Sequence, residues 1–391
     1  MKILVLSFYY KPDLCAGSFR ATALVDQLAH SNVSVDVVTT APNRYASFEV
    51  KAPKVERSTN VAVHRVKLPS HQSGMVDQIK AFIAYYNGAQ ALVKKSDYDI
   101  VFATSSRLFT AFLGARIAKR KKLPLYLDIR DIFADTMGDI LPTKIAWFIK
   151  PLLSLIERYT FAGAKRINLV SQGFSSYFEA RYRKVPTTFF TNGIDEEFME
   201  VAPSPEQQSR TAPRITVLYA GNIGAGQGLH KIIPELALRL KDSVDFRIIG
   251  DGGKKNEFKA AISKLELMNV QLLPPLGRGD LIKEYCKSDV LFLHLDDVPA
   301  FEKVLPSKLF EYAAMGKPIW AGLGGYSSNF ACSEITNCEV FAPGNCDDAV
   351  EKFAALDLNE KRRGDFVKKF SRKAIMEKMA QDVLEVANNH D

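Results

Sequence analysis

Short apolar runs alternate with amphipathic stretches along the first half of the chain. Residues 2–8 and 33–39 have the composition of buried strands, and residues 19–30 place Ala21, Leu24 and Leu28 on one face of a helix. The alternation continues with strands at 61–66, 100–104, 125–128, 167–171 and 187–191, and with helices at 78–95 and 110–121. Strands that alternate with helices predict β-α-β units and a parallel sheet covered on both faces.

The alternation stops once and then resumes. Pro203, Pro205 and Pro213 punctuate a polar stretch without periodicity, which predicts a linker at 201–213. After it come strands at 215–220, 246–250, 270–273, 290–294 and 319–321, helices at 229–240, 254–265, 281–287, 308–315 and 349–355, and a charged helix at 361–388. We therefore expect an α/β protein with two Rossmann-like, doubly wound domains at 1–200 and 214–369. Ligands of such sheets bind beyond the carboxyl ends of the strands, which here predicts a cleft between the domains.

Composition agrees with two globular domains and narrows the class of partner. A chain of 391 residues is long for one core, and 47% hydrophobic with 25% charged residues excludes disorder as a description of the whole. The formal net charge of +8 favours an anionic partner. Nucleotide-activated substrates, nucleic acid and the anionic face of a membrane all meet this condition.

Cysteine usage and the first residues predict a cytoplasmic protein. The five cysteines are odd in number and form no C-x-x-C pair, which is typical of reduced thiols. The apolar run of residues 2–10 is short and meets Lys11-Pro12 without a cleavage site, so it predicts a strand instead of a signal peptide. No run of about 18 apolar residues occurs, so we expect no transmembrane helix.

The richest segment for chemistry spans residues 298–312. Pro306 and Ser307 form a helix-start signal, with Ser307 placed to cap the helix. The unpaired N–H groups and positive dipole at such a helix start favour a phosphate. Lys308 is a cation in the first turn, where it needs an anion, and Glu311 lies one turn on, where it can accept hydrogen bonds from a ribose diol. The alternative is a capped amphipathic helix that only packs on the sheet.

Glycines follow the first strand of the second half. Gly221 and Gly224 come after 215–220, and the lack of a Cβ lets a backbone approach a pyrophosphate closely. The dinucleotide-binding spacing fails, because Leu229 stands where the third glycine would be needed after Gly224 and Gly226.

In the first half, Asp128-Ile-Arg130-Asp131 follows a strand and points toward the predicted cleft. Asp131 can take or orient the proton of an acceptor hydroxyl, and Arg130 can hold an acceptor phosphate. The alternative is an Asp/Arg ion pair that closes the strand end. Gly17 and Ser18, at the start of the helix after the first strand, are candidates for contact with donor phosphates.

Metal ligands are not predicted. Asp296-Asp297 follows a strand, but two adjacent acids in a loop are usually solvated, and the six histidines have no ligand spacing. A surface for membranes is predicted at residues 143–165, where Trp147, Phe148 and leucines mix with Lys150 and Arg158. The alternative there is a helix packed on the sheet.

The sequence resembles a known family at these motifs. Residues 306–312, Pro-Ser-Lys-Leu-Phe-Glu-Tyr, with Gly-Lys-Pro-Ile at 316–319, look like the donor-binding signature of retaining glycosyltransferases of family 4, which have the GT-B fold. The subgroup that builds bacterial surface polysaccharides and transfers N-acetylated aminosugars is most similar. Further matches occur at 2–10 with 16–18, at 191–195, at 221–224 with 227–228, and at 250–252.

The resemblance implies a metal-independent transfer without a cofactor. The donor is a UDP-sugar, the acceptor an undecaprenyl-diphosphate-linked saccharide of O-antigen or capsule assembly, and attack takes place on the front face. The C-terminal helix, about 370–391, is expected to cross back to the first domain. The implied catalytic residues are Asp131, Glu302 and Lys308, and the acceptor-binding residues are Asp128 and Arg130. The implied donor-binding residues are Gly17, Ser18, Asn222, Gly224, Gln227, Gly250, Lys254, Ser307, Lys308, Leu309 and Glu311.

The sequence departs from the family pattern at three charged positions. Lys303 stands where the family commonly has a first glutamate, so either Glu302 or the 301–303 backbone is expected to meet the donor sugar. Asn222 and Gln227 stand where relatives carry Arg and Lys, so Lys308, helped by Lys254, is expected to carry more of the phosphate charge.

Two other functions remain open from the sequence. A GT-B sugar-nucleotide epimerase would keep the fold and need no acceptor. A basic scaffold for membranes would need no chemistry at all. Nucleic acid is disfavoured, because the chain has no strand that interleaves aromatic and basic residues and no basic recognition helix.

Overall fold

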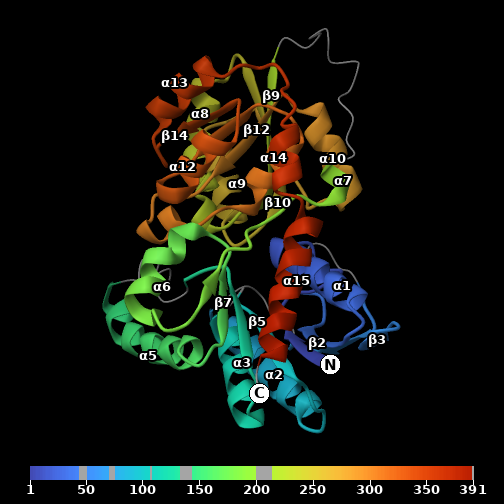
Figure 1. The fold of residues 1–391 in the computed structure, drawn as a ribbon. Coiled ribbons are helices and arrows are strands. Elements are labelled where there is room, and N and C mark those ends of the chain that lie inside the picture. The colour runs from blue at the N-terminus through green and yellow to red at the C-terminus, as the bar shows by residue number, and fades with distance from the viewer. Residues whose placement is uncertain (44–50, 70–74, 106–107, 133–142, 200–213, 390–391) are drawn as a thin grey trace. The chain divides into compact units, whose positions relative to one another are not determined.

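A computed structural model describes residues 1–391 except 44–50, 70–74, 106–107, 133–142, 200–213 and 390–391, and except the side chains of 75–76 and 143–150. The chain divides into two compact units, drawn in Figure 1. Unit 1 comprises Met1–Asn192 with Arg372–Asp391, and unit 2 comprises Gly193–Ser371. The predicted linker at 201–213 lies outside the described residues.

Unit 1 is built on an eight-stranded sheet. The strands are β1 (Lys2–Leu6), β2 (Ser34–Thr40), β3 (Val55–Arg57), β4 (Val61–Val66), β5 (Ile100–Thr104), β6 (Leu125–Ile129), β7 (Arg166–Leu169) and β8 (Thr187–Thr188). Their order is β3-β4-β2-β1-β5-β6-β7-β8, and every pair is parallel except β3 with β4. The predicted parallel sheet is confirmed. The central strands are apolar throughout because both faces are buried.

Helices cover this sheet (Figure 1). They are α1 (Ala16–His30), α2 (Met75–Val93), α3 (Leu108–Lys121), α5 (Thr143–Phe161), α6 (Ser175–Tyr182) and α15 (Arg372–Asn388), with a 3₁₀ turn, η1 (Gln172–Phe174). The apolar stripe predicted for α1 is buried, and it shares a hydrophobic cluster with Met376 and Met379 of α15. The last helix of the chain is therefore part of the core of unit 1.

Unit 2 has a six-stranded sheet that is parallel throughout. Its order is β11-β10-β9-β12-β13-β14, with β9 (Ile215–Asn222), β10 (Val244–Asp251), β11 (Val270–Leu273), β12 (Val290–His294), β13 (Ile319–Gly322) and β14 (Cys338–Phe341). The helices are α7 (Glu196–Met199), α8 (Leu229–Arg239), α9 (Lys255–Lys264), α10 (Arg278–Lys287), α11 (Ser307–Ala314), α12 (Gly325–Glu334), α13 (Cys346–Ala355) and α14 (Gly364–Lys369). Two 3₁₀ turns, η3 (Ala225–Gln227) and η4 (Pro299–Lys303), lie at strand ends.

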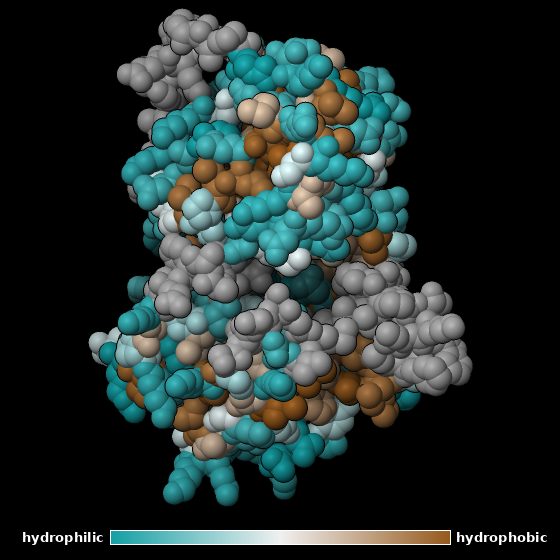
Figure 2. All heavy atoms as spheres, turned by 180° about the vertical axis from the view of Figure 1, so that it is seen from behind, coloured by the Kyte–Doolittle hydropathy of each residue, from teal (hydrophilic) through white to brown (hydrophobic). Residues whose placement is uncertain are grey.

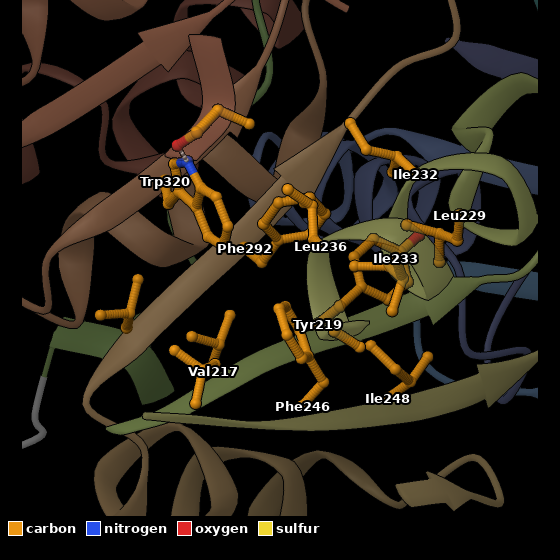
Figure 3. Close-up of a cluster of buried hydrophobic side chains, with 14 of the residues drawn as sticks. Val217, Tyr219, Leu229, Ile232, Ile233, Leu236, Phe246, Ile248, Phe292 and Trp320 are labelled. Atoms are coloured by element: carbon orange, nitrogen blue, oxygen red, sulfur yellow. Dashed lines mark hydrogen bonds between the residues drawn. The ribbon is translucent and has the colours of Figure 1, made fainter. Parts of the chain in front are cut away.

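The surface and the interior separate by hydropathy in the usual way. Figure 2 shows hydrophilic residues over most of one face, interrupted by apolar patches on both units. Figure 3 shows the core of unit 2, where Phe246 and Phe292 pack near Trp320. The indole N–H of Trp320 donates to the carbonyl of Ala349 at 3.0 Å, which satisfies the one polar group of that fully buried side chain.

The structure corrects the prediction of one terminal helix at 361–388. Two helices are present, α14 and α15, and the chain leaves helical geometry at Phe370. Ser371 forms a β-bridge with Ile194, and the amide N–H of Ile194 donates to the carbonyl of Phe370 at 2.8 Å. This backbone pairing replaces the helical hydrogen bonds where the chain passes from unit 2 to unit 1.

Two further sequence predictions concern thiols and membranes. All five cysteines are free thiols, as predicted. Within the described ranges, no helix combines the length and the apolar character needed to cross a bilayer.

Candidate functional site

The carboxyl ends of β9 and β10 approach each other very closely. Gly221 and Gly250 are paired across the two strands. A Cβ added at Gly250 would lie 1.8 Å from the carbonyl oxygen of Gly221, and Gly250 has φ of +155°. Only glycine fits both conditions. Gly250, which was predicted to contact the donor, therefore has a packing role in joining these strand ends.

Lys308 reaches the same strand end from α11. A Cβ added at Gly221 would lie 2.3 Å from Cε of Lys308 and 2.7 Å from its Nζ. The ammonium also lies 5.9 Å from the ring centroid of Tyr219. The glycine turn and the lysine, far apart in the sequence, are thus brought together as the sequence analysis expected of a phosphate seat.

The start of α11 differs from the prediction in one respect. The helix begins at Ser307, the N-cap residue is Pro306, and no side chain caps the helix. Ser307 therefore lies inside the first turn instead of capping it. The amide N–H groups at this end keep their partial positive charge, and Lys308 adds a full charge beside them.

Leu309 and Glu311 of α11 were also predicted to bind the donor, and only Glu311 is retained as a candidate. Leu309 is fully buried and its amide N–H donates to the carbonyl of Pro306 at 3.2 Å, so we assign it to packing. Glu311 is only 7% exposed, in the helix that Lys308 opens. A nearly buried carboxylate is stabilised by hydrogen-bond donors, which a ligand with hydroxyl groups supplies.

Asn222 and Gln227 form a neutral bridge across the turn after β9. The amide of Asn222 donates to Oε1 of Gln227 at 2.8 Å. A Cβ added at Gly224 would lie 2.3 Å from Nδ2 of Asn222, so glycine is needed for the two side chains to meet. The neutral side chains of Asn222 and Gln227 thus occupy the two positions where relatives in the family pattern carry Arg and Lys.

Lys254 precedes α9 and is engaged by a neighbour. Its ammonium forms an ion pair with Glu257, and its amide N–H donates to the carbonyl of Ile223 at 2.9 Å. The ion pair lowers the pKa of Glu257. Lys254 is therefore less available to an anion than the sequence suggested.

The turn η4 carries the three residues expected to meet the donor sugar. The ring of Phe301 would lie 2.8 Å from a Cβ added at Gly226, so it packs on the turn after β9. Gly325 leaves room for the carbonyl and Cβ of Glu302, which a Cβ there would meet at 2.3 and 2.6 Å. Glu302 is exposed, while Lys303 is half-buried.

His294 is held as a neutral ring. Its Nε2 accepts from the amide N–H of Gly344 at 3.0 Å, so Nδ1 carries the proton and donates to the carbonyl of Gln227 at 2.7 Å. Burial lowers its pKa. Asp296 pairs with Lys231 at 2.6 Å. No three His, Cys, Asp or Glu of the described residues cluster as metal ligands, and metal independence stays a prediction.

In unit 1, Asp128 forms a buried ion pair that the sequence analysis missed. Nε and one terminal nitrogen of Arg20 donate to its two carboxylate oxygens, each at 2.9 Å, and Asn168 donates at 2.8 Å. Burial alone would raise the pKa of Asp128, but the charge and hydrogen bonds of Arg20 outweigh it and hold the pKa below its usual value. Arg20 adjoins the apolar stripe of α1. A charged residue at that position was the one sign in the sequence that a buried partner of opposite charge should exist.

Because both oxygens of Asp128 are occupied, we do not retain it as an acceptor-binding residue. Arg20 also donates to the carbonyls of Phe190 and Thr191, each at 2.7 Å, so the pair ties α1 and β6 to the segment after β8. The alternative of an ion pair at this strand end is the one observed, although its arginine is Arg20 instead of Arg130.

Arg130 and Asp131 follow β6 and have different surroundings. Nε of Arg130 is buried and has no hydrogen-bond partner among the described residues. Burial lowers the pKa of this guanidinium. The side chain of Asp131 is accessible, yet the surrounding protein raises the pKa of its carboxyl to about 6, against the opposing charge of Arg130. A guanidinium with a buried, unpartnered Nε beside a weakly acidic carboxyl suits an anionic, hydroxyl-bearing acceptor.

Gly17 and Ser18 lie in the first turn of α1. Both are buried, no side chain caps this helix, and the hydroxyl of Ser18 has no partner within the described part of the chain. Their contact with donor phosphates stays a prediction.

The predicted membrane stretch falls on α5. The side chains of 143–150, with Trp147 and Phe148, lie outside the described ones. Leu152 and Leu155 are 58% and 66% exposed.

Comparisons with known proteins match both halves of the chain. A family model described as glycosyl transferase 4-like domain matches residues 17–193. A second model, glycosyl transferases group 1, matches residues 203–373. The putative colanic acid biosynthesis glycosyl transferase WcaI of Escherichia coli K12 is 26% identical over 340 residues, which cover 81% of this chain and 82% of the relative.

Solved structures share the fold. Sucrose-phosphate synthase of Thermosynechococcus elongatus aligns with a TM-score of 0.77 at 14% identity, covering 98% of both chains. WaaG, a glycosyltransferase involved in lipopolysaccharide biosynthesis, aligns at 0.66 and 16%, covering 100% of this chain and 95% of WaaG. HepE of Anabaena, solved with UDP-glucose, aligns at 0.69 and 16%, covering 98% of this chain and all of HepE.

Two parallel α/β units, a cationic glycine turn and family models across both halves lead to one assignment: the chain is a glycosyltransferase of family 4 with the GT-B fold.

Proposed function

We propose that the protein transfers an N-acetylated aminosugar, with retention of anomeric configuration, from a UDP-sugar to an undecaprenyl-diphosphate-linked saccharide in O-antigen or capsule assembly. The observation that carries the proposal is the position of Lys308, whose ammonium lies against Gly221 and at the uncapped start of α11. A full positive charge, helix N–H groups and an open glycine backbone together suit a diphosphate.

In this role Lys308 and the helix N-terminus stabilise charge that develops on the leaving diphosphate. The bond from the anomeric carbon to the UDP oxygen breaks, and its electron pair goes to the diphosphate. Fixed cations and N–H groups at that oxygen lower the barrier, because they need no reorganisation when the charge appears. Because Asn222 and Gln227 are uncharged, fewer positive groups are present to stabilise the charge on the diphosphate.

Glu311 is proposed to accept hydrogen bonds from the ribose of the donor. Glu311 is only 7% exposed, and the two hydroxyl groups of a ribose diol supply hydrogen-bond donors to a nearly buried carboxylate. The exposed Glu302 and the backbone of η4 are proposed to meet the sugar itself.

Arg130 and Asp131 are proposed for the acceptor. The guanidinium of Arg130, whose Nε is buried without a partner among the described residues, suits a phosphate of the lipid diphosphate. Asp131 takes or orients the proton of the acceptor hydroxyl, while that hydroxyl oxygen forms the new bond to the anomeric carbon on the face that UDP leaves. The metal-free character of this chemistry is part of the proposal.

Relatives support the donor and the pathway. HepE was solved with UDP-glucose, and the names of WcaI and WaaG place them in colanic acid and lipopolysaccharide synthesis. None of these names specifies an aminosugar or a lipid-linked acceptor for this chain.

The test is transfer with a panel of UDP-sugars and a synthetic undecaprenyl-diphosphate-linked saccharide, in buffer with EDTA. We expect a product only with a UDP-N-acetylaminosugar, with NMR showing the anomeric configuration of the donor. A product of inverted configuration would contradict retention, and turnover with UDP-glucose alone would contradict the aminosugar. Release of an altered UDP-sugar without acceptor would indicate an epimerase.

A further inference from the structure

The turn η3 is held by the end of β12 and by the segment that follows it. The last residue of β12, His294, donates from Nδ1 to the carbonyl of Gln227 at 2.7 Å. Two residues later, the amide N–H of Asp296 donates to the carbonyl of Gly226 at 2.9 Å. A Cβ added at Gly228 would lie 3.1 Å from a carboxylate oxygen of Asp296, so the residue after the turn packs on the same segment. The position of η3 therefore depends on residues that come much later in the chain.

The ring of His294 is fixed by its surroundings. The residue is only 1% exposed, and its ring lies nearly parallel to that of Phe292, with the two centroids 6.3 Å apart. The centroid of the Phe341 ring lies 6.0 Å from that of the imidazole. Gly322 leaves room for the imidazole, because a Cβ there would lie 2.2 Å from its Cδ2. Figure 3 shows Phe292 within the core of unit 2, so the imidazole joins this core to η3.

Both ring nitrogens of His294 have partners, and the pairing requires the neutral ring. Nε2 accepts from the amide N–H of Gly344, in the loop between β14 and α13, at 3.0 Å. A proton on Nε2 would abolish this bond and would direct one N–H group at another. Burial lowers the pKa of His294. The hydrogen bond to Gln227 and the charge of Asp296 oppose this effect on the pKa, while Lys231 adds to it. The neutral form with its proton on Nδ1 is thus the one that holds η3.

Gln227 connects this ring to the candidate donor seat. Its carbonyl accepts from His294, and its side-chain Oε1 accepts from Nδ2 of Asn222 at 2.8 Å. Asn222 directly follows Gly221, whose missing Cβ leaves the room that Lys308 fills. Because the backbone and the side chain of Gln227 are both fixed, the orientation of the histidine ring is transmitted to the bridge between Asn222 and Gln227.

Asn222 and Gln227 are neutral amides, which makes their orientation important. An ammonium is a point charge that attracts a phosphate from any side, whereas an N–H group must point at the oxygen atom to form a hydrogen bond. Groups that are held in the binding orientation before the ligand arrives also lose less conformational entropy when it binds. A turn that meets a diphosphate through amide groups therefore needs a rigid support.

We propose that His294 is a positioning residue for the donor: its neutral ring holds η3, and through Gln227 it orients the amide groups of the turn toward the donor diphosphate. This inference rests on the proposed function, in which the same site binds that diphosphate with Lys308. It adds a residue that acts through Gln227 and does not itself touch the donor. All the residues involved belong to unit 2, so the inference requires nothing of unit 1.

The test uses three variants that separate the two hydrogen bonds of the ring. The side-chain nitrogen in His294→Asn can donate where Nδ1 does, and the longer side chain in His294→Gln can accept where Nε2 does. His294→Phe keeps an aromatic ring and has neither bond. The control Trp320→Phe removes another buried hydrogen bond of the same aromatic cluster, to the carbonyl of Ala349, which does not involve η3. Affinity for UDP-N-acetylglucosamine is measured by calorimetry, affinity for uridine by ligand-observed NMR, and stability by thermal unfolding.

We expect His294→Asn to bind UDP-N-acetylglucosamine within about twofold of the wild type. His294→Gln and His294→Phe should bind it about five- to tenfold more weakly, because they lack the bond to Gln227. Affinity for uridine, which has no diphosphate, should stay within about twofold of the wild type in every variant. Trp320→Phe should unfold at a lower temperature and still bind the nucleotide sugar like the wild type.

Equal affinities of His294→Asn and His294→Gln for the nucleotide sugar would overturn the inference, as would a loss in Trp320→Phe as large as that in His294→Phe. A similar loss for uridine and for the nucleotide sugar would also contradict it, because the whole site would then be disturbed. The variant Lys308→Ala keeps failure of this inference distinct from failure of the proposed function. Normal binding by Lys308→Ala would contradict the proposed function, whereas weak binding by it together with normal binding by every His294 variant would contradict this inference alone.

Discussion

The carboxyl group of Asp131 combines an accessible side chain with a pKa raised to about 6 by the surrounding protein. If it accepts the proton of the acceptor hydroxyl, the active form is the carboxylate, which predominates above that pH. We predict that kcat/KM falls as the pH drops through about 6. Asp131→Asn should be about 10²-fold slower and should lose this acid limb. An Asn variant that keeps the same limb would assign the titration to another group.

Arg20 and Asp128 predict a pH-dependent contribution to stability. Both side chains are 2% exposed, so Arg20→Met leaves a buried carboxylate without its partner. We expect a loss of about 3–5 kcal/mol in the free energy of unfolding at pH 7, measured with urea.

The sign of the pH effect follows from the lowered pKa of Asp128. The contribution of the pair is present above the ordinary carboxyl pKa of about 4 and is lost as the pH falls through the folded value. The difference between wild type and Arg20→Met should therefore shrink in acid. Equal urea midpoints at pH 7 would show that the pair contributes nothing.

At the scale of single residues, the sequence indicated candidate site residues better than it indicated which side chains contact each other. Lys308 and Gly221 were both candidates from the sequence, and the structure brings them together. Their contact with a phosphate stays a prediction. The ion-pair partner of Asp128 was not predicted, because Arg20 lies in a helix far away in the chain and only the tertiary fold brings the two residues together. The capping role of Ser307 was wrong by one position, since Pro306 takes the N-cap place.

At the scale of elements, the pairing of β9 with β10 depends on Gly250. We predict that Gly250→Ala lowers the free energy of unfolding by at least about 2 kcal/mol, because its Cβ would meet a backbone oxygen and its φ is unfavourable for alanine. Gly253→Ala is the matched control, since a Cβ there would meet nothing within 4 Å. Similar urea midpoints for both variants would contradict the packing role.

Central strands were predicted well because parallel strands buried on both faces are continuous apolar runs. Strands β5, β11 and β12 have the predicted bounds. The sequence analysis missed the exposed β3, as well as α12 and β14, whose periodicity is short or weak. The break between α14 and α15 was also missed, because the backbone pairing of Ser371 with Ile194 leaves no mark in hydrophobic periodicity.

At the scale of the whole molecule, repeated alternation and the motif at 306–312 were sufficient to identify the fold and family, which the family models confirm. The donor sugar and the acceptor remain proposals, and the membrane surface stays a prediction. They depend on a few side chains and on surface charge, which neither periodicity nor family membership determines.

The central claim is that Lys308 and the start of α11 seat the donor diphosphate. The most direct measurement is binding of UDP and UDP-N-acetylglucosamine by calorimetry to the wild type, Lys308→Ala and the control Lys259→Ala. We predict a loss of about tenfold or more in affinity for both ligands in Lys308→Ala and less than about twofold in the control. Equal affinities of the wild type and Lys308→Ala would contradict the account.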